Sequence, residues 1–350
     1  MPSRIEDVTP AWLAGMLGAA PAAVREIRVV HADSGTAARA RIEVTGDAGI
    51  PPTLFLKLPP RDYPQHVLMT LFGLGTSEIN AYQVLGSAPP IRVPRCHAAR
   101  SDPRWGRDVL VLEDLSPTAR FRTITDPVDQ GEAEAVVDAM ADLHAAHWGA
   151  ARSGSGLAAL ATRSEVDVEL GLLIRRRLLG ARTTSLVPAA MREQLAIFSE
   201  RGREIDAFWA QGPQTLIHGD PHLGNLFFEG AVPGFLDWQI ATVGPGIRDV
   251  AYFANSSVEP GLLRQLERGL VERYAARLAA AGIAADPDQL WTLYRVGITE
   301  LLLAIVCTAA AGERMQSAEV TRCGVQRAVA AAEAHDSLAL LTALLDGKRV

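Results

Sequence analysis

The sequence of 350 residues contains few cysteines and no excess of basic residues. Its three cysteines, Cys96, Cys307 and Cys323, lie far apart and form no C-x-x-C pair. This pattern excludes a disulfide scaffold and predicts reduced thiols in a cytoplasmic protein. The formal net charge is -6, whereas nucleic-acid-binding proteins usually carry a basic stripe. We therefore expect no nucleic-acid partner.

Long apolar runs are missing as well. The N-terminal stretch "MPSRIEDVTPAWLAGMLGAA" has charges and a proline where an export signal has an unbroken apolar region. The most apolar segment, "GITELLLAIVCTAAAG" (297–312), contains Glu300 and is shorter than the roughly 20 residues that cross a bilayer. The sequence thus predicts a buried helix at 297–312 and no membrane partner.

Short runs of large apolar and β-branched residues predict strands in the first third of the chain. They are "ARARIEV" (38–44), "TLFLKL" (53–58) and "DVLVLEDL" (108–115), each bounded by Gly, Pro or Asp. Between the last two, apolar spacing favours one or two helices that end near Gly86. We expect an α+β protein of two lobes: a strand-rich nucleotide-binding lobe over 1–115 and a mainly helical catalytic and substrate-binding lobe over 116–350.

Helical patterns dominate from residue 126 onward. Asp126 followed by Pro127 predicts the N-cap and first turn of a helix that runs through "VVDAMADLHAAHW". Further helices are predicted over about 165–210 and 260–345. The exception is "TLIHGDPHLGNLFFEGAVPGFLDWQ" (215–239), which is typical of a strand, a loop and then a β-hairpin that turns at "EGAVPG".

The predicted hairpin indicates a function for the polar run "HGDPHLGN" (218–225). Asn225 precedes its first strand and Asp237 follows its second. Antiparallel strands lie about 5 Å apart, so the two side chains can face one cation. Both offer hard oxygen ligands, which Mg²⁺ prefers. Asp220 then remains to accept a proton from a hydroxyl group, and these are the parts that phosphoryl transfer from Mg·ATP requires.

Candidates for the remaining parts of such a site lie upstream. Lys57, in the strand "LFLKL", can reach nucleotide phosphates, and Glu78 is placed early in a helix to pair with it. The turn Ser34, Gly35 and Thr36 precedes a strand, and its backbone N–H groups can cover phosphates. At the end of "VLVLEDL", the backbone of Glu113 and Leu115 can bind adenine.

At these residues the chain resembles the aminoglycoside phosphotransferase family, whose members are two-lobed enzymes of the protein-kinase-like fold. The resemblance rests on "HGDPHLGN", "FLDWQ" and "GPGIRDVAYF". "LEDL" and "DWQ" favour the branch with ecdysteroid-kinase-like and choline-kinase-like enzymes. The resemblance implies a small-molecule kinase that uses Mg²⁺ and ATP, or GTP, to phosphorylate a hydroxyl group.

The resemblance also implies a role for each matching position. Asp220 is the catalytic aspartate, Asn225 and Asp237 are the Mg²⁺ ligands, and Lys57 with Glu78 holds the phosphates.

It further implies that Asp249, on the next helix, steadies the catalytic loop through backbone N–H groups. His218 supports the same loop, and His222 forms hydrogen bonds near the metal or the phosphate. A single glycine in residues 33–38 departs from the family's phosphate-covering loop.

Several alternatives remain open at this stage. The acceptor can be a metabolite, a xenobiotic or an aminoglycoside antibiotic, because the helices that form its pocket carry no readable motif. A non-catalytic nucleotide-binding protein would retain the fold, although it would typically lose Asp220, Asn225 or Asp237. A zinc hydrolase would use the histidine pairs "LHAAH" (143–147) and "HGDPH" (218–222), neither of which has the H-E-x-x-H arrangement. The arginine run Arg175–Arg177 is either an acid-binding site or a solvated helix face. The sequence sets no oligomeric state.

Overall fold

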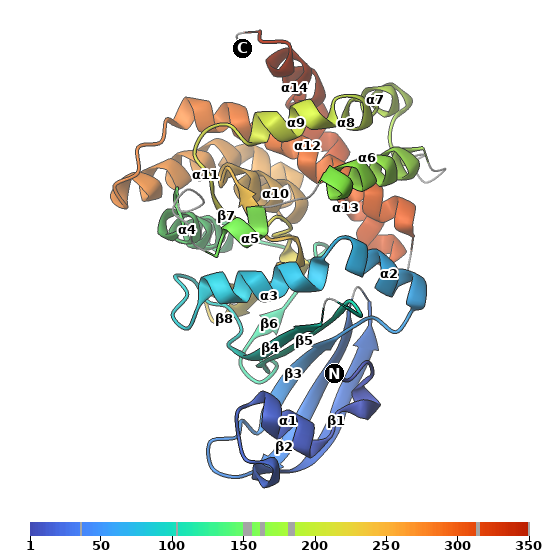
Figure 1. Cartoon of the computed structure of the whole chain (residues 1–350). Coiled ribbons are helices and arrows are strands. Elements are labelled where there is room, and N and C mark those ends of the chain that lie inside the picture. Colours follow the sequence, from blue (N-terminus) through green and yellow to red (C-terminus); the bar gives the residue numbers. More distant parts are fainter. Residues whose placement is uncertain are drawn as a thin grey trace. The chain divides into compact units, whose positions relative to one another are not determined.

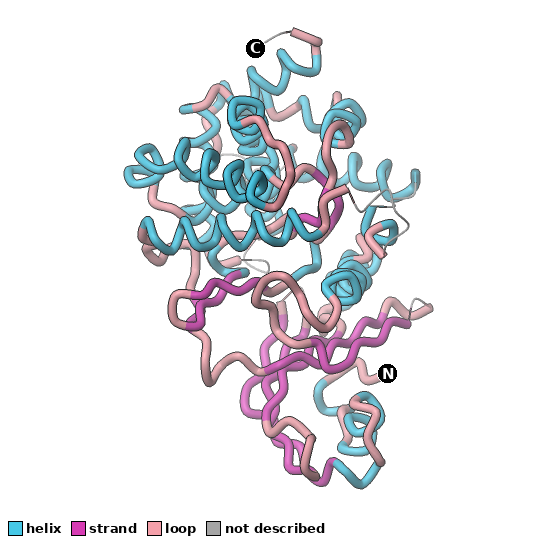
Figure 2. Tube along the Cα trace, turned by 90° about the vertical axis from the view of Figure 1, so that its left-hand side faces the viewer, coloured by secondary structure: helices cyan, strands magenta, loops and turns pink. Residues whose placement is uncertain are grey.

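The computed structural model describes residues 1–35, 37–102, 104–149, 156–161, 165–180, 186–312 and 316–348. It divides the chain into two units. The N-terminal unit comprises residues 1–89, 93–119 and 236–240, and the C-terminal unit comprises residues 90–92, 120–235 and 241–350. Strands dominate the first and helices the second, so the expected α+β class is confirmed (Figures 1 and 2).

A five-stranded antiparallel sheet in the order β1-β2-β3-β5-β4 forms the body of the N-terminal unit. Its strands are β1 (Val24–Ser34), β2 (Ala38–Gly46), β3 (Thr53–Leu58), β4 (Cys96–Asp102) and β5 (Arg107–Glu113). Burial alternates along β2, and β3 and β5 are largely buried. One apolar face of this sheet therefore has to be covered.

Helix α1 (Pro10–Met16) helps to cover that face, and two short 3-10 turns lie on either side of it (Ile5–Asp7 and Pro21–Ala23). Thr9 caps α1 by accepting a hydrogen bond from the Trp12 N–H, and Pro10 occupies its first turn. Leu13 of α1 and Ile42, Leu54 and Leu56 of the sheet share one core and are fully buried. This packing fixes β3, the strand that carries Lys57.

Two consecutive helices follow β3. They are α2 (Tyr63–Leu71) and α3 (Leu74–Leu85). Gly73, whose φ is 62°, separates them, and Gly86, whose φ is 66°, ends α3. Positive φ favours glycine, so both breaks follow from the sequence. The prediction of two helices ending near Gly86 is confirmed, and α3 buries Glu78 together with Ile79 and Leu85.

Two small sheets lie within the C-terminal unit. One pairs β7 (Thr215–Ile217) with β10 (Thr242–Gly244), and the other has the order β6-β8-β9, with β6 (Arg120–Phe121), β8 (Leu226–Glu229) and β9 (Val232–Phe235). β8 and β9 form the predicted hairpin, in which Leu226 pairs with Phe235. The chain turns at Gly230, whose φ is 62°. This register places Asn225 directly before the first strand and Asp237 two residues after the second.

Apart from the helices at 158–161 and 247–257, the helices of the C-terminal unit occupy the regions that the sequence predicts. They are α4 (Gln130–Ala146), α5 (Ala158–Ala161), α6 (Glu165–Leu179), α7 (Ala189–Gln194), α8 (Ile197–Glu200), α9 (Gly202–Trp209), α10 (Ile247–Ser257), α11 (Pro260–Ala280), α12 (Pro287–Ala311), α13 (Ala318–Ala334) and α14 (Ser337–Leu345).

The predicted N-cap of α4 is wrong. Asp129, not Asp126, caps this helix in a capping box with Glu132. Each of these two residues accepts a hydrogen bond from the other's backbone N–H, which satisfies two otherwise unpaired donors. Asp126 instead accepts from the Thr123 N–H at 2.7 Å in the preceding turn.

The apolar segment 297–312 belongs to α12, a helix that is long and apolar enough to cross a membrane. About half of its most apolar window, 56 %, is buried inside the protein. Val296, Ile298, Leu301 and Leu302 are buried, and α12 packs against α10 and α13. The predicted buried helix is therefore present, and it extends further toward the N-terminus than its most apolar part.

Candidate active site

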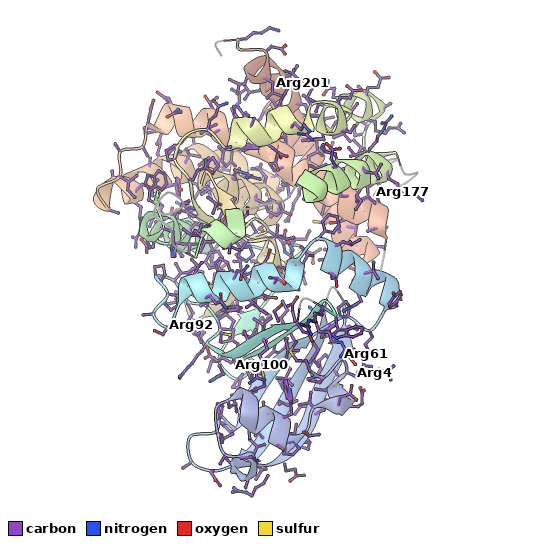
Figure 3. All side chains as sticks on the ribbon, in the orientation of Figure 1. Arg4, Arg61, Arg92, Arg100, Arg177 and Arg201 are labelled. Carbon is purple, nitrogen blue, oxygen red and sulfur yellow. The ribbon has the colours of Figure 1, made fainter. Side chains whose placement is uncertain are left out.

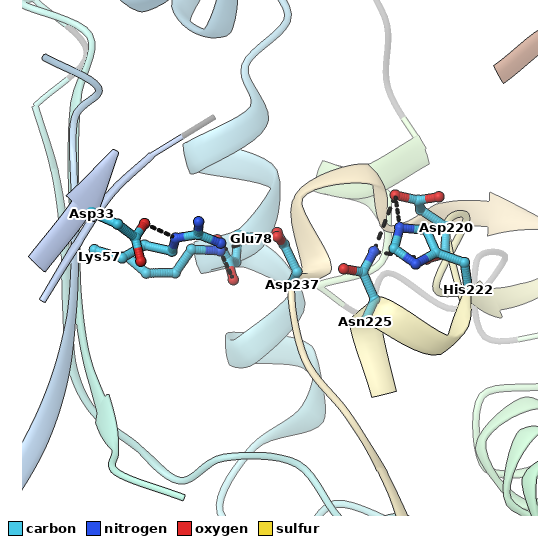
Figure 4. A network of polar contacts seen from close by, with 8 residues as sticks. Asp33, Lys57, Glu78, Asp220, His222, Asn225 and Asp237 are labelled. Atoms are coloured by element: carbon cyan, nitrogen blue, oxygen red, sulfur yellow. Dashed lines mark hydrogen bonds and ion pairs between the residues drawn. The ribbon is translucent and has the colours of Figure 1, made fainter. Parts of the chain in front are cut away.

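Lys57 is held by two carboxylates within the N-terminal unit. Its Nζ lies 2.8 Å and 2.6 Å from the two carboxylate oxygens of Glu78, and 3.0 Å from Oδ1 of Asp237 (Figure 4). Lys57 is 5 % exposed and Glu78 is 1 % exposed. The structure therefore brings together the pair predicted from the sequence and adds Asp237 to it.

Burial and charge oppose each other at this cluster. Burial alone would lower the pKa of Lys57, but the nearby Asp237 and Glu78 carboxylates outweigh it and raise that pKa. Lys57 is consequently a fixed cation at neutral pH. Burial raises the pKa of Glu78, an effect that the Lys57 ammonium opposes. The charged lysine thus depends on both carboxylates.

The backbone at Asp237 is unusual. Its φ is 63°, in the left-handed region, where residues other than glycine are uncommon. A 3-10 turn over Trp238–Ile240 follows, and the backbone of Trp238 donates a hydrogen bond to Glu78. Backbone strain of this kind is concentrated at functional sites. In this conformation the Asp237 carboxylate contacts Lys57.

The candidate phosphate-covering loop is a tight turn between β1 and β2. Ser34 pairs with Ala38, and the Gly35 N–H donates to the carbonyl of Ala37 at 2.9 Å. Thr36 lies outside the described residues. The phosphate-binding role of this turn remains a prediction.

Arg39 lies beside this turn and was not predicted. In the β2–β3 register Arg39 pairs with Lys57, so both side chains share one face of the sheet. The Nε of Arg39 donates to Asp33 Oδ1 at 2.7 Å. Because this proximity arises from strand register, only the pairing of β2 with β3 could have revealed it.

Glu113 ends β5 and Leu115 follows two residues later; these are the residues whose backbone is predicted to bind adenine. The N–H of Glu113 donates to the Arg95 carbonyl at 2.9 Å, and its carboxylate accepts from the Arg95 N–H at 2.9 Å. The carbonyl of Leu115 accepts from Thr118 and Ala119. The adenine-binding role of the Glu113 and Leu115 backbone remains a prediction.

Asp220 and Asn225 are linked on the loop of the C-terminal unit. The Nδ2 of Asn225 donates to the Asp220 carbonyl at 2.9 Å and to Asp220 Oδ2 at 3.1 Å (Figure 4). This orients the amide so that Oδ1 is the group of Asn225 available to a cation. The Nδ1 of His222 accepts from the Gly224 N–H at 3.0 Å, and its Nε2 lies 3.7 Å from Asp220 Oδ2.

Asp249 of α10 anchors this loop from below. Its Oδ2 accepts from the His218 N–H at 2.6 Å, and its Oδ1 accepts from the Gly219 N–H at 2.9 Å. Gly219 has a φ of 83°, which a residue with a Cβ would rarely adopt. His218 is fully buried and its Nδ1 accepts from the Asp220 N–H at 3.3 Å. The contacts implied for Asp249 and His218 are present, while their part in a reaction remains a prediction.

Two buried groups extend this anchor. His144 of α4 contacts Asp249 through Nε2 at 3.3 Å and the hydroxyl of Tyr274 through Nδ1 at 2.9 Å. Burial would raise the pKa of Asp249, but the interactions with His144 and His218 and the hydrogen bond from the Gly219 N–H together outweigh it and lower that pKa. Asp249 is thus ionised when it accepts the two loop N–H groups.

Tyr252 lies on the same helix, α10, close enough to Asp220 for the charge of this carboxylate to affect its pKa. Burial, followed by the charge of Asp220, raises the pKa of Tyr252 well above its usual value. Tyr252 is therefore a neutral phenol at neutral pH. "RDVAYF" contains this tyrosine three residues after Asp249, so the helical period could have indicated that the two lie on one side of α10.

A zinc site and a magnesium site would use different side chains, and the zinc candidate His144 already has hydrogen-bond partners. Both ring nitrogens of His144 are used by Tyr274 and Asp249. Across the described ranges, no group of three or more His, Cys, Asp or Glu side chains is placed to hold a metal ion. The oxygens of Asn225 and Asp237 are hard donors, which suit Mg²⁺ completed by water and phosphate rather than zinc.

The sequence also matches a known family over residues 29–290, which is more than half of the chain. The chain belongs to the phosphotransferase enzyme family. A comparison with curated proteins finds no match.

Solved structures share its fold at low sequence identity. A choline kinase from Streptococcus pneumoniae is 14% identical, with a TM-score of 0.53 over 89% of this chain and 94% of that one. A protein described as an aminoglycoside phosphotransferase from Ralstonia eutropha is 15% identical, with a TM-score of 0.53 over 90% and 92%. APH(2") in complex with GDP and kanamycin is 12% identical, with a TM-score of 0.50 over 90% and 94%. The expected protein-kinase-like fold is thereby confirmed.

The remaining sequence hypotheses concern surface charge. Arg176 and Arg177 are exposed on α6, and Figure 3 labels Arg177 at the surface. Exposed arginines on a helix need no ligand, so a solvated face accounts for them.

Proposed function

We propose that this phosphotransferase is an ATP- and Mg²⁺-dependent kinase that phosphorylates a hydroxyl group of a small molecule. The observation that carries the proposal is the buried Lys57, held by Glu78 and Asp237. Burying a charge is costly unless it is paired, so a buried lysine between two carboxylates is retained for its chemistry or its partners. A nucleotide triphosphate is a ligand that needs such a cation.

The nucleotide is assigned to the N-terminal lobe, proposed to span 1–115. Lys57 binds its phosphates, with the turn at Ser34, Gly35 and Thr36 over them. For the base, the carbonyl of Glu113 and the N–H of Leu115 complement the donor and acceptor edges of adenine. APH(2") was solved with GDP, and this supports testing GTP beside ATP.

Transfer itself is assigned to the C-terminal lobe, proposed to span 116–350. Asp220 orients the acceptor hydroxyl and takes its proton late, because a loose transition state needs little base assistance. Asn225 holds the Asp220 carboxylate in place through its side-chain amide. Asn225 and Asp237 would hold Mg²⁺, which would neutralise charge on the transferring phosphoryl group. Most of the rate acceleration then comes from alignment and fixed charges.

The acceptor is proposed to be a small alcohol, and the site of action the cytoplasm. Reduced cysteines and the burial of α12 within the C-terminal unit support the second point.

A thermal-shift titration tests the nucleotide half of the proposal. Mg·ATP at a hundred times its dissociation constant should stabilise the protein by about 2.7 kcal/mol. Asp220→Asn should keep this shift, because Asp220 serves the acceptor. Asp237→Asn should lose it, because Asp237 holds both the cation and Lys57. A shift of equal size in Asp237→Asn, or no shift in the unchanged protein with ATP or GTP, contradicts the proposal.

A turnover assay tests the transfer half. The protein would be screened with Mg·ATP against aminoglycosides, choline-like amines, sugars and lipophilic alcohols. Asp220→Asn should reduce kcat on any accepted alcohol by orders of magnitude, and Asp138→Asn, a surface control on α4, should not. Retention of full activity in Asp220→Asn would exclude the assigned role.

A further inference from the structure

A cavity of about 320 Å³ lies within the C-terminal unit, and its lining contains none of the residues assigned to the proposed reaction. It is bounded by the ends of α4 and α9, by the start of α10, by α11 and by the α11–α12 connection. No residue of the loop 218–225 lines it. Its volume is at the lower end of the range for small-molecule sites, so it is large enough for a compact organic ligand.

The cavity is aromatic on one side. Trp148, Phe208 and Trp209 line it, and the rings of Phe208 and Trp209 meet edge to face with centroids 5.0 Å apart. Apolar side chains such as Ile247, Leu290 and Leu293 complete the wall. Such a lining favours a ligand with an apolar body.

Charge selects among apolar ligands. Among the described residues, no lysine or arginine is part of the lining and Asp286 is its one acidic residue, although the Arg248 guanidinium lies over the Trp209 ring, 5.0 Å from its centroid. Asp286 is exposed at the N-cap of α12, where its Oδ1 accepts from the Asp288 N–H at 3.0 Å. Aromatic faces attract organic cations, and a carboxylate at the rim adds to this attraction. The combination complements an ammonium group.

A chain of hydrogen-bond contacts connects the lining of the cavity with the loop 218–225. Tyr274 forms part of the lining, and its hydroxyl contacts His144 at 2.9 Å. His144 contacts Asp249, which accepts the His218 and Gly219 N–H groups. Gly246, also in the lining, packs against Tyr274 and His144 so closely that an added Cβ would clash with the Tyr274 hydroxyl. A movement of Tyr274 caused by a ligand in the cavity would therefore also move His144 and Asp249.

We propose that this cavity is a second small-molecule site, which takes an organic ammonium ion with an apolar body. Its occupancy acts on the catalytic loop through Tyr274, His144 and Asp249. None of the residues that line the cavity belongs to the loop that carries Asp220.

Calorimetric titration with benzyltrimethylammonium tests the binding. Asp286→Asn keeps a good helix N-cap but removes the charge, and it should weaken binding about two- to fivefold, the range for an exposed cation site. Phe208→Leu should weaken it by a similar factor. Asp288→Asn, which alters a neighbouring charge outside the lining, should leave binding unchanged, as should Asp220→Asn. Benzyl alcohol, which has the ring without the charge, should bind more weakly than the cation.

Three outcomes overturn the site: no binding of the cation, equal binding of benzyl alcohol, or binding that Asp286→Asn and Phe208→Leu leave unchanged. Loss of binding in Asp220→Asn would place the cation in the acceptor site instead. These readouts need no turnover, so they stand or fall separately from the proposed kinase activity.

Hydrogen exchange tests the coupling. Benzyltrimethylammonium should change the exchange rate of the His218 and Gly219 amides at least twofold in the unchanged protein. Tyr274→Phe retains the ring but loses the hydroxyl, so it should bind the cation and lose this effect. An unchanged exchange rate in the original protein, or an equal effect in Tyr274→Phe, overturns the coupling.

Discussion

At the scale of single residues, the choice of lysine at position 57 is informative. The chain has 34 lysines and arginines together, and Lys57 and Lys348 are its two lysines. Lysine is a compact point charge, whereas arginine is a planar fork. Lys57 is buried, and at this position a compact ammonium group concentrates the charge at one point.

Removing that charge should destabilise the protein. Lys57→Met leaves Glu78 buried beside Asp237 without its cation, and breaking a buried pair in this way costs about 3–5 kcal/mol. Lys57→Met/Glu78→Gln removes both buried charges and should recover much of the loss. Urea denaturation of both variants measures this difference. Equal instability of the single and the double variant would show that Glu78 is not the source of the cost.

Arg39 should contribute to nucleotide binding. It shares the sheet face of Lys57 and lies beside the turn at Gly35. Arg39→Gln should raise the dissociation constant for ATP about tenfold, which corresponds to about 1.4 kcal/mol. Arg28→Gln is the matched control, because Arg28 lies on the same sheet but pairs with Glu43. An equal effect of the two substitutions would reduce the role of Arg39 to general surface charge.

Asp249 should show its role through pH. The pKa of Asp249 is lowered in the folded protein, so its stabilisation is complete above the unfolded pKa of about 3.9 and disappears as pH falls below that value. Asp249→Asn cannot satisfy both loop N–H groups, and an unsatisfied buried donor costs about 1–3 kcal/mol. In urea denaturation the two proteins should therefore differ fully at pH 7 and pH 5, and less near pH 3. A difference that is constant with pH would contradict the assignment.

At the scale of elements, α10 holds the loop 218–225 through Asp249, and the start of α10 packs directly against α4 and α11. Gly246 directly precedes α10, and its neighbours are His144 of α4 and Tyr274 of α11. The three elements meet where a Cβ has no space.

A pair of glycine substitutions tests this packing. Gly246→Ala would place a Cβ 2.5 Å from Nδ1 of His144, so overpacking should destabilise the protein by about 1–3 kcal/mol and reduce turnover. Gly269→Ala, in the interior of α11 where an added Cβ meets nothing within 4 Å, should instead stabilise it by up to about 1 kcal/mol. Thermal unfolding of the two variants measures the contrast. If Gly246→Ala and Gly269→Ala changed the stability by a similar amount, the contacts among Gly246, His144 and Tyr274 would not be tightly packed.

The elements also differ in how far the sequence determines them. β2, β3 and β5 were predictable because their apolar residues pack on the core. β1 was not predicted, since most of its residues are exposed and its pattern lacks regular alternation. β4, "CHAARSD", is equally polar along its length. Both depend on pairing with a neighbouring strand rather than on their own residues.

At the scale of the whole molecule, the sequence predicts contacts that follow from one strand, one turn or one helix. The hairpin places Asn225 and Asp237 at its two ends because its register follows from the turn at Gly230. The capping of α4 could not be decided locally, because Asp126 and Asp129 are both suitable and only the second has Glu132 to complete a capping box. Arg39, Tyr274 and His144 depend on how separate elements pack, which one sequence does not show.

Contacts with other elements also distinguish whether α12 is a core helix or a membrane helix. By composition it resembles a membrane span, yet Glu300 lies within it and accepts hydrogen bonds from Trp209 Nε1 at 3.1 Å and Arg248 Nη2 at 3.1 Å. Lipid offers neither partner, and a carboxylate that is only 21% exposed is more stable when it is bonded. The helix is therefore a core helix that carries one internal ion pair.

Glu300→Leu distinguishes a core helix from a membrane helix. In a membrane, replacing an acidic residue with leucine should strengthen insertion, because Leu is favourable at the helix centre and Asp, Lys and Arg are not. In the core, the same change leaves Arg248 and the Trp209 N–H without their acceptor and should lower the free energy of unfolding by about 1–3 kcal/mol. We expect the unchanged protein to stay in the supernatant after ultracentrifugation without detergent, and Glu300→Leu to unfold at a lower temperature. Glu300→Gln is the control, because its amide oxygen still accepts one hydrogen bond and its loss should be smaller. A pelleted protein that Glu300→Leu makes more stable in detergent would show that α12 belongs in a bilayer.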